Sequence, residues 1–183
     1  MNRIKSFFAL IFTIATFSVL SVNAQSYTSA NQAAEKTVEQ KVYKEILKLP
    51  RYGVFDFISF QVNGSTVTLT GKVYSLGTKG QAARYVKDIA GVSTVINNIE
   101  ELPLSSFDDQ IRREALRTFA RHGLYRYFWE TRPDVRIIVE NGRITLEGYV
   151  ANSGDYNTLN ILANGVSNVF RVQNNLIVGK SSN

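Results

Sequence analysis

The feature that most constrains this chain of 183 residues is an internal repeat. The stretch from Val62 to Val73 aligns with the stretch from Val139 to Val150, so that Gly71 and Gly148 occupy equivalent places 77 positions apart. The same offset, kept without a gap, also aligns later valine and asparagine positions. A match of this length and order predicts that most of the chain is a tandem duplication of one small module.

Each copy contains the pattern of a β-hairpin. In residues 66–71 and 143–148, polar residues alternate with apolar residues or glycine, which is typical of a strand with one buried face. A β-rich run precedes each of these strands, and an Asn-Gly pair between the runs favours a tight turn. Gly71 and Gly148 lie late in the second strand of each hairpin. There a glycine permits close backbone approach, so we interpret both as structural.

Helical patterns flank the hairpins. Apolar residues recur at helical spacing from Thr37 to Leu49, from Ser106 to about Gly123, and from Ala82 to Ile89. Ser106 and Asp109 suit a helix start, because a side-chain oxygen caps free amides and an acid favours the positive end of the helix dipole.

A short strand closes each copy, at Val95–Ile99 and Val172–Val178. The predicted fold class is therefore α+β, with two tandem α-β-β-α-β modules. In each module two helices pack on one face of a three-stranded mixed sheet.

The predicted organisation has five parts. They are a signal peptide at residues 1–24, a flexible N-terminal arm at 25–36, a first domain at 37–101, a linker at 102–105 and a second domain at 106–179. The arm is rich in Ser, Ala and Gln, which is typical of a mobile terminal segment.

The first 24 residues have the three-part pattern of a secretory signal. Arg3 and Lys5 precede an uncharged run from Phe7 to Leu20, and Val22-Asn23-Ala24 then offers small residues for cleavage. The run of 14 residues is shorter than the roughly 20 needed to span a bilayer, so a transmembrane anchor is disfavoured. We expect export to the periplasm.

Cysteine is absent from the chain, which excludes disulfides, thiol nucleophiles and cysteine-based metal sites. Without a cysteine at the cleavage site to carry lipid, we expect a soluble protein with no lipid anchor. Removal of Arg3 and Lys5 from the 21 basic residues leaves 19 against 15 acidic ones, a net charge near +4. That mild excess allows an anionic partner. No nucleic-acid partner is expected, because export separates the chain from nucleic acid and the charge follows no known reading motif.

The two copies resemble the BON domain. The resemblance rests on the G-x-V-x-L-x-G type hairpins and on the Gly-Val-x-x-Val-x-Asn-x-aliphatic endings, which are found at Asn63–Val73, Asn141–Val150, Gly91–Ile99 and Val169–Leu176. It covers nearly the whole processed chain, and two copies behind a signal peptide are similar to the arrangement in OsmY-like periplasmic proteins. In the second copy the Gly-Val pair can be matched in two registers, which leaves the end of its last helix open. The resemblance implies an envelope protein that binds phospholipid and has no catalytic activity.

The sequence shows no catalytic or metal-binding pattern. His122 is the only histidine, and without a second histidine or a cysteine a transition-metal site is disfavoured. Asp108 and Asp109 are best interpreted as a negatively charged helix start. No serine lies in a nucleophile motif, and the glycines form no phosphate-binding fingerprint. We therefore expect neither an enzyme nor a cofactor.

One segment of the second copy has no counterpart in the first. The first helices of the copies align with an offset of 69 rather than 77, so about eight extra residues precede the second hairpin. They are rich in aromatic residues, and the helix before them carries arginines at successive i, i+4 positions. The candidate lipid-binding residues are Arg113, Arg117, Arg121, Arg126, Tyr127, Phe128 and Trp129.

Arginines beside amphipathic rings suit a membrane surface, where guanidinium groups meet anionic headgroups and rings lie at the polar boundary. We therefore expect the second domain to bind anionic phospholipid at a membrane surface. The alternative for the residues is that the aromatics fill the core or an interface while the arginines form a solvated face. The alternative for the function is a periplasmic stress protein with chaperone-like activity, or an adaptor that binds envelope proteins.

Overall fold

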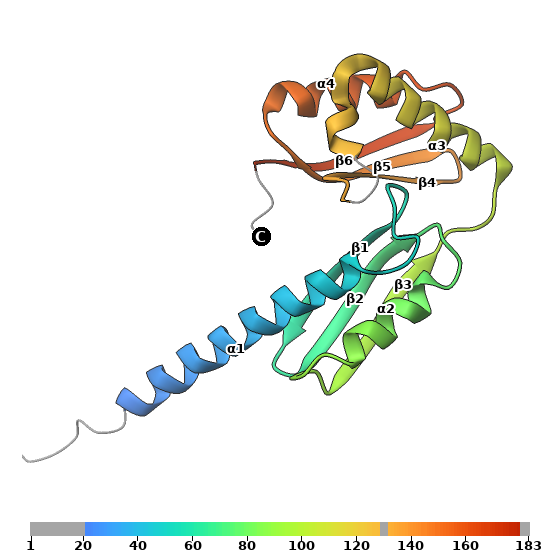
Figure 1. Ribbon diagram of the computed structural model, residues 1–183. Helices are drawn as coiled ribbons and strands as arrows, with labels where there is room; N and C mark the ends of the chain where they lie inside the picture. The colour runs from blue at the N-terminus through green and yellow to red at the C-terminus, as the bar shows by residue number, and fades with distance from the viewer. Residues whose placement is uncertain (1–20, 129–131, 180–183) are drawn as a thin grey trace, which may run out of the picture. The chain divides into compact units, whose positions relative to one another are not determined.

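The computed structural model describes residues 21–128 and 132–179 (Figure 1). The elements are α1 (Ser21–Leu47), β1 (Phe57–Asn63), β2 (Thr66–Val73), α2 (Thr78–Lys87), β3 (Thr94–Glu101), α3 (Ser106–Phe119), a π-helical turn (Ala120–Leu124), a 3-10 turn (Tyr125–Phe128), β4 (Val135–Glu140), β5 (Arg143–Val150), α4 (Ser153–Asn164) and β6 (Arg171–Val178). Of the predicted signal peptide, residues 1–20 lie outside the described residues.

Each module is built on a three-stranded mixed sheet. The order is β1-β2-β3 in the first module and β4-β5-β6 in the second, with an antiparallel hairpin followed by a parallel third strand. The registers are equivalent: Gly71 is the partner of Ile58 and of Ile99, and Gly148 is the partner of Val135 and of Leu176. The predicted α+β class and the tandem α-β-β-α-β modules are confirmed.

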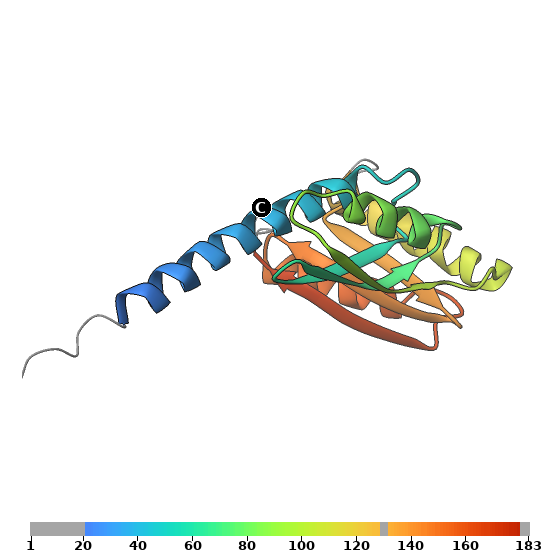
Figure 2. The same cartoon turned by 90° about the horizontal axis from the view of Figure 1, so that it is seen from below.

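Both helices of a module cover the same face of its sheet (Figures 1 and 2). Alternate residues of each central strand point toward the helices and are fully buried, as Val67 and Leu69 are in β2 and Ile144 and Leu146 are in β5. In the first module they meet apolar residues of α1 and α2, and in the second module residues of α3 and α4. The period-two pattern in the sequence therefore identified the core face of each sheet.

Gly71 and Gly148 are the positions where the backbones of a hairpin come closest. Both have positive φ, 121° and 115°. A β-carbon on Gly71 would lie 2.2 Å from the carbonyl oxygen of Phe57, and one on Gly148 would lie 2.0 Å from that of Asp134. A side chain is therefore excluded at both positions by contact with the backbone as well as by φ.

Besides shifts of two to four residues at the end of α1 and at both ends of α2, the helix boundaries differ from the predicted ones in three places. Residues 25–36, expected to form a flexible arm, lie within α1, which begins at Ser21 rather than Thr37. The segment contains neither Gly nor Pro, and seven of its twelve residues are Ala, Gln, Glu or Lys, all good helix formers. The cap of α3 is Ser105, whose Oγ accepts a hydrogen bond from Asp108 N, and not Ser106.

The third difference concerns the end of α3, which was expected near Gly123. The α-helix ends at Phe119, and the extra residues of the second copy continue as the π-helical turn and the 3-10 turn. Gly123 interrupts the helical backbone with φ of 77°. The eight-residue difference between the copies is thus accommodated outside the sheet, between helix and hairpin.

A carboxylate from the first helix of each module holds the turn of its hairpin. Glu35 accepts a 2.7 Å hydrogen bond from Gly64 N. Asp108, which is buried, accepts bonds of 3.0 and 2.8 Å from the backbone amides of Asn141 and Gly142. Asp108 is therefore a structural anchor for the turn as well as part of a negatively charged helix start.

Residues Glu35–Asn183 form one compact unit, and within it the two modules contact each other. The loop before β1 runs along the outer edge of β4, where Val54 O accepts a 2.8 Å hydrogen bond from Ile137 N. The guanidinium of Arg136 donates to Gly53 O at 2.6 Å and lies 4.3 Å from the ring centroid of Tyr52. These contacts cover an edge strand that would otherwise expose unpaired backbone groups.

Candidate functional site

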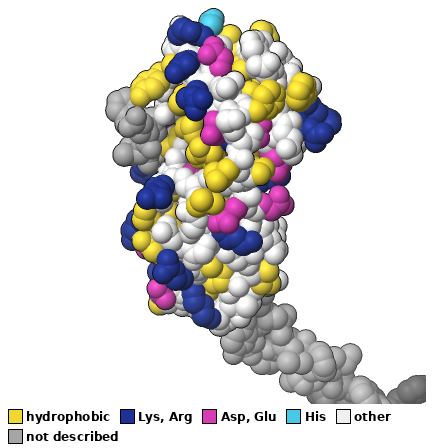
Figure 3. All heavy atoms as spheres, turned by 90° about the vertical axis from the view of Figure 1, so that its right-hand side faces the viewer, with side chains coloured by type: hydrophobic (Ala, Val, Ile, Leu, Met, Phe, Trp, Pro, Cys, Tyr) yellow, Lys and Arg dark blue, Asp and Glu magenta, His cyan; other side chains and the backbone are white. Residues whose placement is uncertain are grey.

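The predicted arginine stripe begins on the exposed face of α3 and ends in the π-helical turn, which contains Arg121. Arg113 and Arg117 are exposed, and among the described residues neither guanidinium has an ion-pair or hydrogen-bond partner. Arg121 is also exposed, but it pairs with Glu114 at 2.9 Å. On this side of the molecule, several basic side chains lie in a row near the single histidine, with hydrophobic side chains close by (Figure 3). Two of the three stripe residues are therefore free to meet an anionic partner.

A groove connects the stripe to the loop between α4 and β6. It has a volume of about 310 Å³. Its lining residues are Gln110, Ile111, Arg113, Glu114, Arg117, Ser167 and Asn168. Glu114 is the one acid in that lining, and Arg121 already pairs with it. The groove therefore combines two unpaired arginines and several hydrogen-bond donors with one carboxylate whose charge Arg121 offsets, and its excess of positive charge suits an anion.

Arg126 and Tyr127 form a polar cluster with the start of α4. The Asp155 carboxylate accepts a 2.7 Å hydrogen bond from Arg126 and a 2.5 Å bond from the Tyr127 hydroxyl, which itself accepts one from Ala151 N at 2.9 Å. The hydrogen bond that Arg126 donates to the Asp155 carboxylate raises the pKa of Arg126. Arg126 is exposed but has its charge partner within the protein.

Tyr127 and Phe128 are buried in the core of the second module, with exposures of 4% and 2%. Phe128 stacks on Phe119 with a centroid distance of 5.4 Å. For these two rings the structure agrees with the alternative in which the aromatics fill the core. Trp129 lies outside the described residues.

Two exposed phenylalanines were not singled out from the sequence. Phe170, just before β6, is 76% exposed and Phe107, in the first turn of α3, is 39% exposed. Their rings stack with a centroid distance of 6.0 Å. Comparison of the two copies position by position would have found Phe170, because Ser93 occupies the equivalent place in the first copy.

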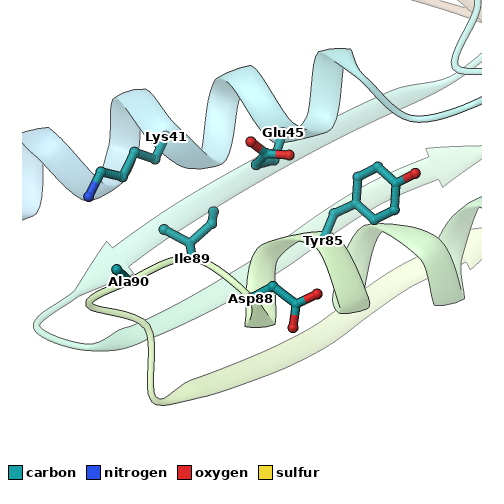
Figure 4. A pocket seen from close by; sticks show the side chains of 6 residues that line it. All are labelled: Lys41, Glu45, Tyr85, Asp88, Ile89 and Ala90. Atoms are coloured by element: carbon teal, nitrogen blue, oxygen red, sulfur yellow. The ribbon is translucent and has the colours of Figure 1, made fainter.

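Elsewhere on the described surface, a groove of the first domain has similar chemistry, with Arg84, Lys87 and the acid Asp88 among its lining residues. A pocket of about 480 Å³ between α1 and α2 is lined by residues of both charges, including Lys41, Glu45 and Asp88 (Figure 4). His122 is exposed, and its Nδ1 lies 2.8 Å from the carbonyl oxygen of Thr118. The described residues contain no group of three metal-ligating side chains. None of the described helices is both long and apolar enough to cross a membrane.

Two of the comparisons with known proteins carry no argument about this chain. Two solved structures of CdsD, a structural protein of the type III secretion system of Chlamydia trachomatis, align with this chain. The C-terminal domain has 11% identity and a TM-score of 0.32, and covers 75% of this chain and 96% of its own. The second has 12% identity and a TM-score of 0.33, and covers 80% and 94%. Similarity this low carries no functional argument. No curated protein matches the sequence.

The third comparison is specific. The model of the BON domain matches the chain twice, over residues 34–103 and 107–180. BON domains are generally non-catalytic and are associated with the periplasm or cell envelope. Because the two matches together cover most of the sequence and coincide with the two three-stranded modules, the chain belongs to the BON domain family and carries two BON domains in tandem.

Proposed function

We propose that this chain is a non-catalytic, exported envelope protein that binds reversibly to anionic phospholipid membranes through its second BON domain. The signal-like pattern of residues 1–24 supports export to the periplasm, and the family is one of envelope-type modules for which phospholipid binding is suggested. The interacting surface is the exposed side of α3.

One observation carries the proposal. Among the described residues, the guanidinium groups of Arg113 and Arg117 have no ion-pair or hydrogen-bond partner. A basic side chain near an anionic bilayer contributes about 1 kcal/mol, so a few together give measurable but reversible binding. Arg121 and Arg126 contribute less, since Glu114 and Asp155 already offset their charges. Tyr127 and Phe128 support this surface from the core and do not contact lipid directly.

The test is co-sedimentation of the purified protein, without its predicted signal peptide, with liposomes. Vesicles containing phosphatidylglycerol are compared with purely zwitterionic vesicles at low and moderate salt. We expect selective binding to the anionic vesicles. That binding weakens as salt rises, because exposed charges are screened beyond about 10 Å at 0.1 M ionic strength.

A charge-reversal variant locates the surface. R113E/R117E/R121E is expected to abolish binding while leaving the circular dichroism spectrum and melting curve unchanged. The matched control, K41E/K44E/R84E, makes the same change in net charge at three exposed positions of the first domain. Equal loss of binding in both variants would indicate a non-specific charge effect and contradict the assignment to α3. If the unaltered protein binds neither kind of vesicle, the chaperone-like and adaptor functions become the leading hypotheses.

A further inference from the structure

The two domains use one backbone arrangement at the hairpin turn but place different side chains on it. In the first domain Ser93 N donates to Ser65 O at 2.8 Å, and in the second Phe170 N donates to Gly142 O at 2.9 Å. The side chains of Ser65 and Ser93 hydrogen-bond to each other at 2.6 Å. The second domain has a glycine and an exposed phenylalanine instead. The fold therefore does not require an aromatic ring at position 170.

The Phe170 ring occupies space that is open because residue 142 is a glycine. A β-carbon at Gly142 would lie 2.6 Å from Cδ2 of Phe170 and 3.2 Å from Cε1 of Phe107. The hydrogen bonds from the Asn141 and Gly142 amides to buried Asp108 fix the turn beneath the rings. Phe170 is thus held in place by its stacking partner and by the turn while most of its surface faces solvent.

The ring adjoins the anion-suited groove. Ser167 and Asn168, which line the groove opposite Arg113 and Arg117, precede Phe170 in the same loop. Arg171 follows it directly, and its Cα partner Arg143 lines a different pocket together with Glu140 and Glu147. Phe170, an exposed ring, is therefore two residues along the chain from the groove that Arg113 and Arg117 line.

We infer that the groove between α3 and the α4–β6 loop holds the phosphate-bearing headgroup of one anionic phospholipid, while the Phe170 ring enters the interfacial layer beside it. This inference rests on the proposed membrane binding and names the site within it. Charge complementarity selects the partner, because the guanidinium, amide and hydroxyl groups of the groove outnumber its single carboxylate, Glu114, whose charge Arg121 offsets. An aromatic side chain next to such a site is suited to the boundary between headgroups and acyl chains.

A single isosteric change tests the groove. Asn168 has φ of 66°, a conformation that Asp also tolerates, so Asn168→Asp adds a negative charge to the groove while preserving shape. We expect about fivefold weaker binding to phosphatidylglycerol vesicles, the effect of offsetting one basic residue. Thr94→Asp is the matched control, because Thr94 lines a groove of the first domain with Arg84 and Lys87. Its binding should change little.

Site-directed labelling tests the ring. Because the chain has no cysteine, Phe170→Cys, Ile161→Cys and Leu76→Cys each provide one labelling site, and all three positions are exposed. A nitroxide label at position 170 should become protected from a water-soluble relaxation agent when vesicles are added. Labels at positions 161 and 76 should remain accessible.

The outcomes separate this inference from the proposed function. Vesicle binding that is equally sensitive to Asn168→Asp and Thr94→Asp, with an accessible label at 170, would overturn the headgroup site but leave membrane binding by the second domain intact. Absence of vesicle binding by the unaltered protein would overturn both. Self-association without lipid that Phe170→Ser removes would assign the ring to a contact between copies, which also contradicts the inference.

Discussion

The hydroxyl of Tyr127 donates a 2.5 Å hydrogen bond to Oδ2 of Asp155 while accepting one of 2.9 Å from the backbone amide of Ala151. These bonds tie the extra segment of the second domain to the end of β5 and the start of α4. The ring of Tyr127 belongs to the same buried cluster as the strands. Tyr127, which the sequence placed among the candidate lipid-binding residues, thus links two segments of the chain within the core.

Removal of that hydroxyl should weaken the fold but not lipid binding. We expect Tyr127→Phe to lower the free energy of unfolding by about 1–2 kcal/mol, because the buried side of the cluster loses hydrogen-bond partners. Denaturant unfolding measures the change, and co-sedimentation with anionic vesicles should be unaffected. Tyr156→Phe, which loses only a 3.5 Å contact with Asn174 O, is the control and should change stability less. If the Tyr127→Phe variant is folded but binds vesicles more weakly, Tyr127 would contact lipid after all.

The same cluster predicts how stability depends on pH. The hydrogen bond from Tyr127 lowers the pKa of Asp155 below that of a free aspartate; burial opposes this shift, and Arg126 adds to it. Because the folded-state pKa is the lower one, the stabilisation is fully present above the ordinary aspartate pKa of about 4 and is lost as pH falls through the folded-state value.

We therefore expect the stability difference between the unaltered protein and Asp155→Asn to be constant from neutral pH to about pH 5 and to shrink below about pH 4. Denaturant unfolding over this range measures it. Asp88→Asn, an exposed position at the end of α2, is the comparison. A difference that grows on acidification would contradict the assigned direction of the Asp155 shift.

The glycines of the central strands should not accept any side chain. Gly71→Ala and Gly148→Ala each place a β-carbon against a backbone carbonyl at positive φ, so each should destabilise its domain by about 3 kcal/mol or more. Thermal unfolding measures the loss. Gly80→Ala provides the control: Gly80 lies within α2 with open space around it, and the change should be neutral or stabilising by up to about 1 kcal/mol. Unchanged melting of the first two variants would mean that the close backbone approach is absent.

The pairing of charges on α3 predicts unequal effects of single arginines on lipid binding. Arg113→Gln and Arg117→Gln should each weaken binding to anionic vesicles by about fivefold, as expected for loss of one basic residue. Arg121→Gln should have a smaller effect, since Glu114 already offsets that charge, and Glu114→Gln should strengthen binding. Equal effects of the three arginine changes, measured by vesicle titration, would indicate that the ion pair with Glu114 does not persist at the membrane.

The fold was predictable because its signals are local. Alternation in residues 66–71 and 143–148 and the Asn-Gly turns are read directly from neighbouring positions and define both hairpins, and the 77-residue offset shows that the two copies share one fold. The predicted start of α1, Thr37, was wrong because composition was given more weight than helix propensity. Composition suggested a mobile arm, whereas a run without Gly or Pro favours continuation of the helix into residues 25–36.

The candidate site was predictable only in part. The i, i+4 spacing placed Arg113 and Arg117 on one exposed helix face, as observed, because that spacing is a local property of a helix. Burial of Tyr127 depends on Ala151 and Asp155, more than twenty positions away, and no local pattern reports such contacts. Phe170 could have been found by comparing the copies. Its equivalent in the first domain is Ser93, which shows that the fold needs only a small residue at this position.

The parallel pairing of the last strand in each sheet has a consequence for the order of assembly. Partners within a hairpin are separated by a two-residue turn, whereas pairing of Arg143 with Arg171 must close a chain segment that includes all of α4. Closing such a long segment costs chain entropy before the contacts form, so we expect β6 to join its sheet last and to be the most labile strand of that sheet. Phe170 immediately precedes β6. A lipid that holds Phe170 would thereby stabilise the part of the domain that opens most easily, and slowed amide exchange confined to β6 would mark the bound state.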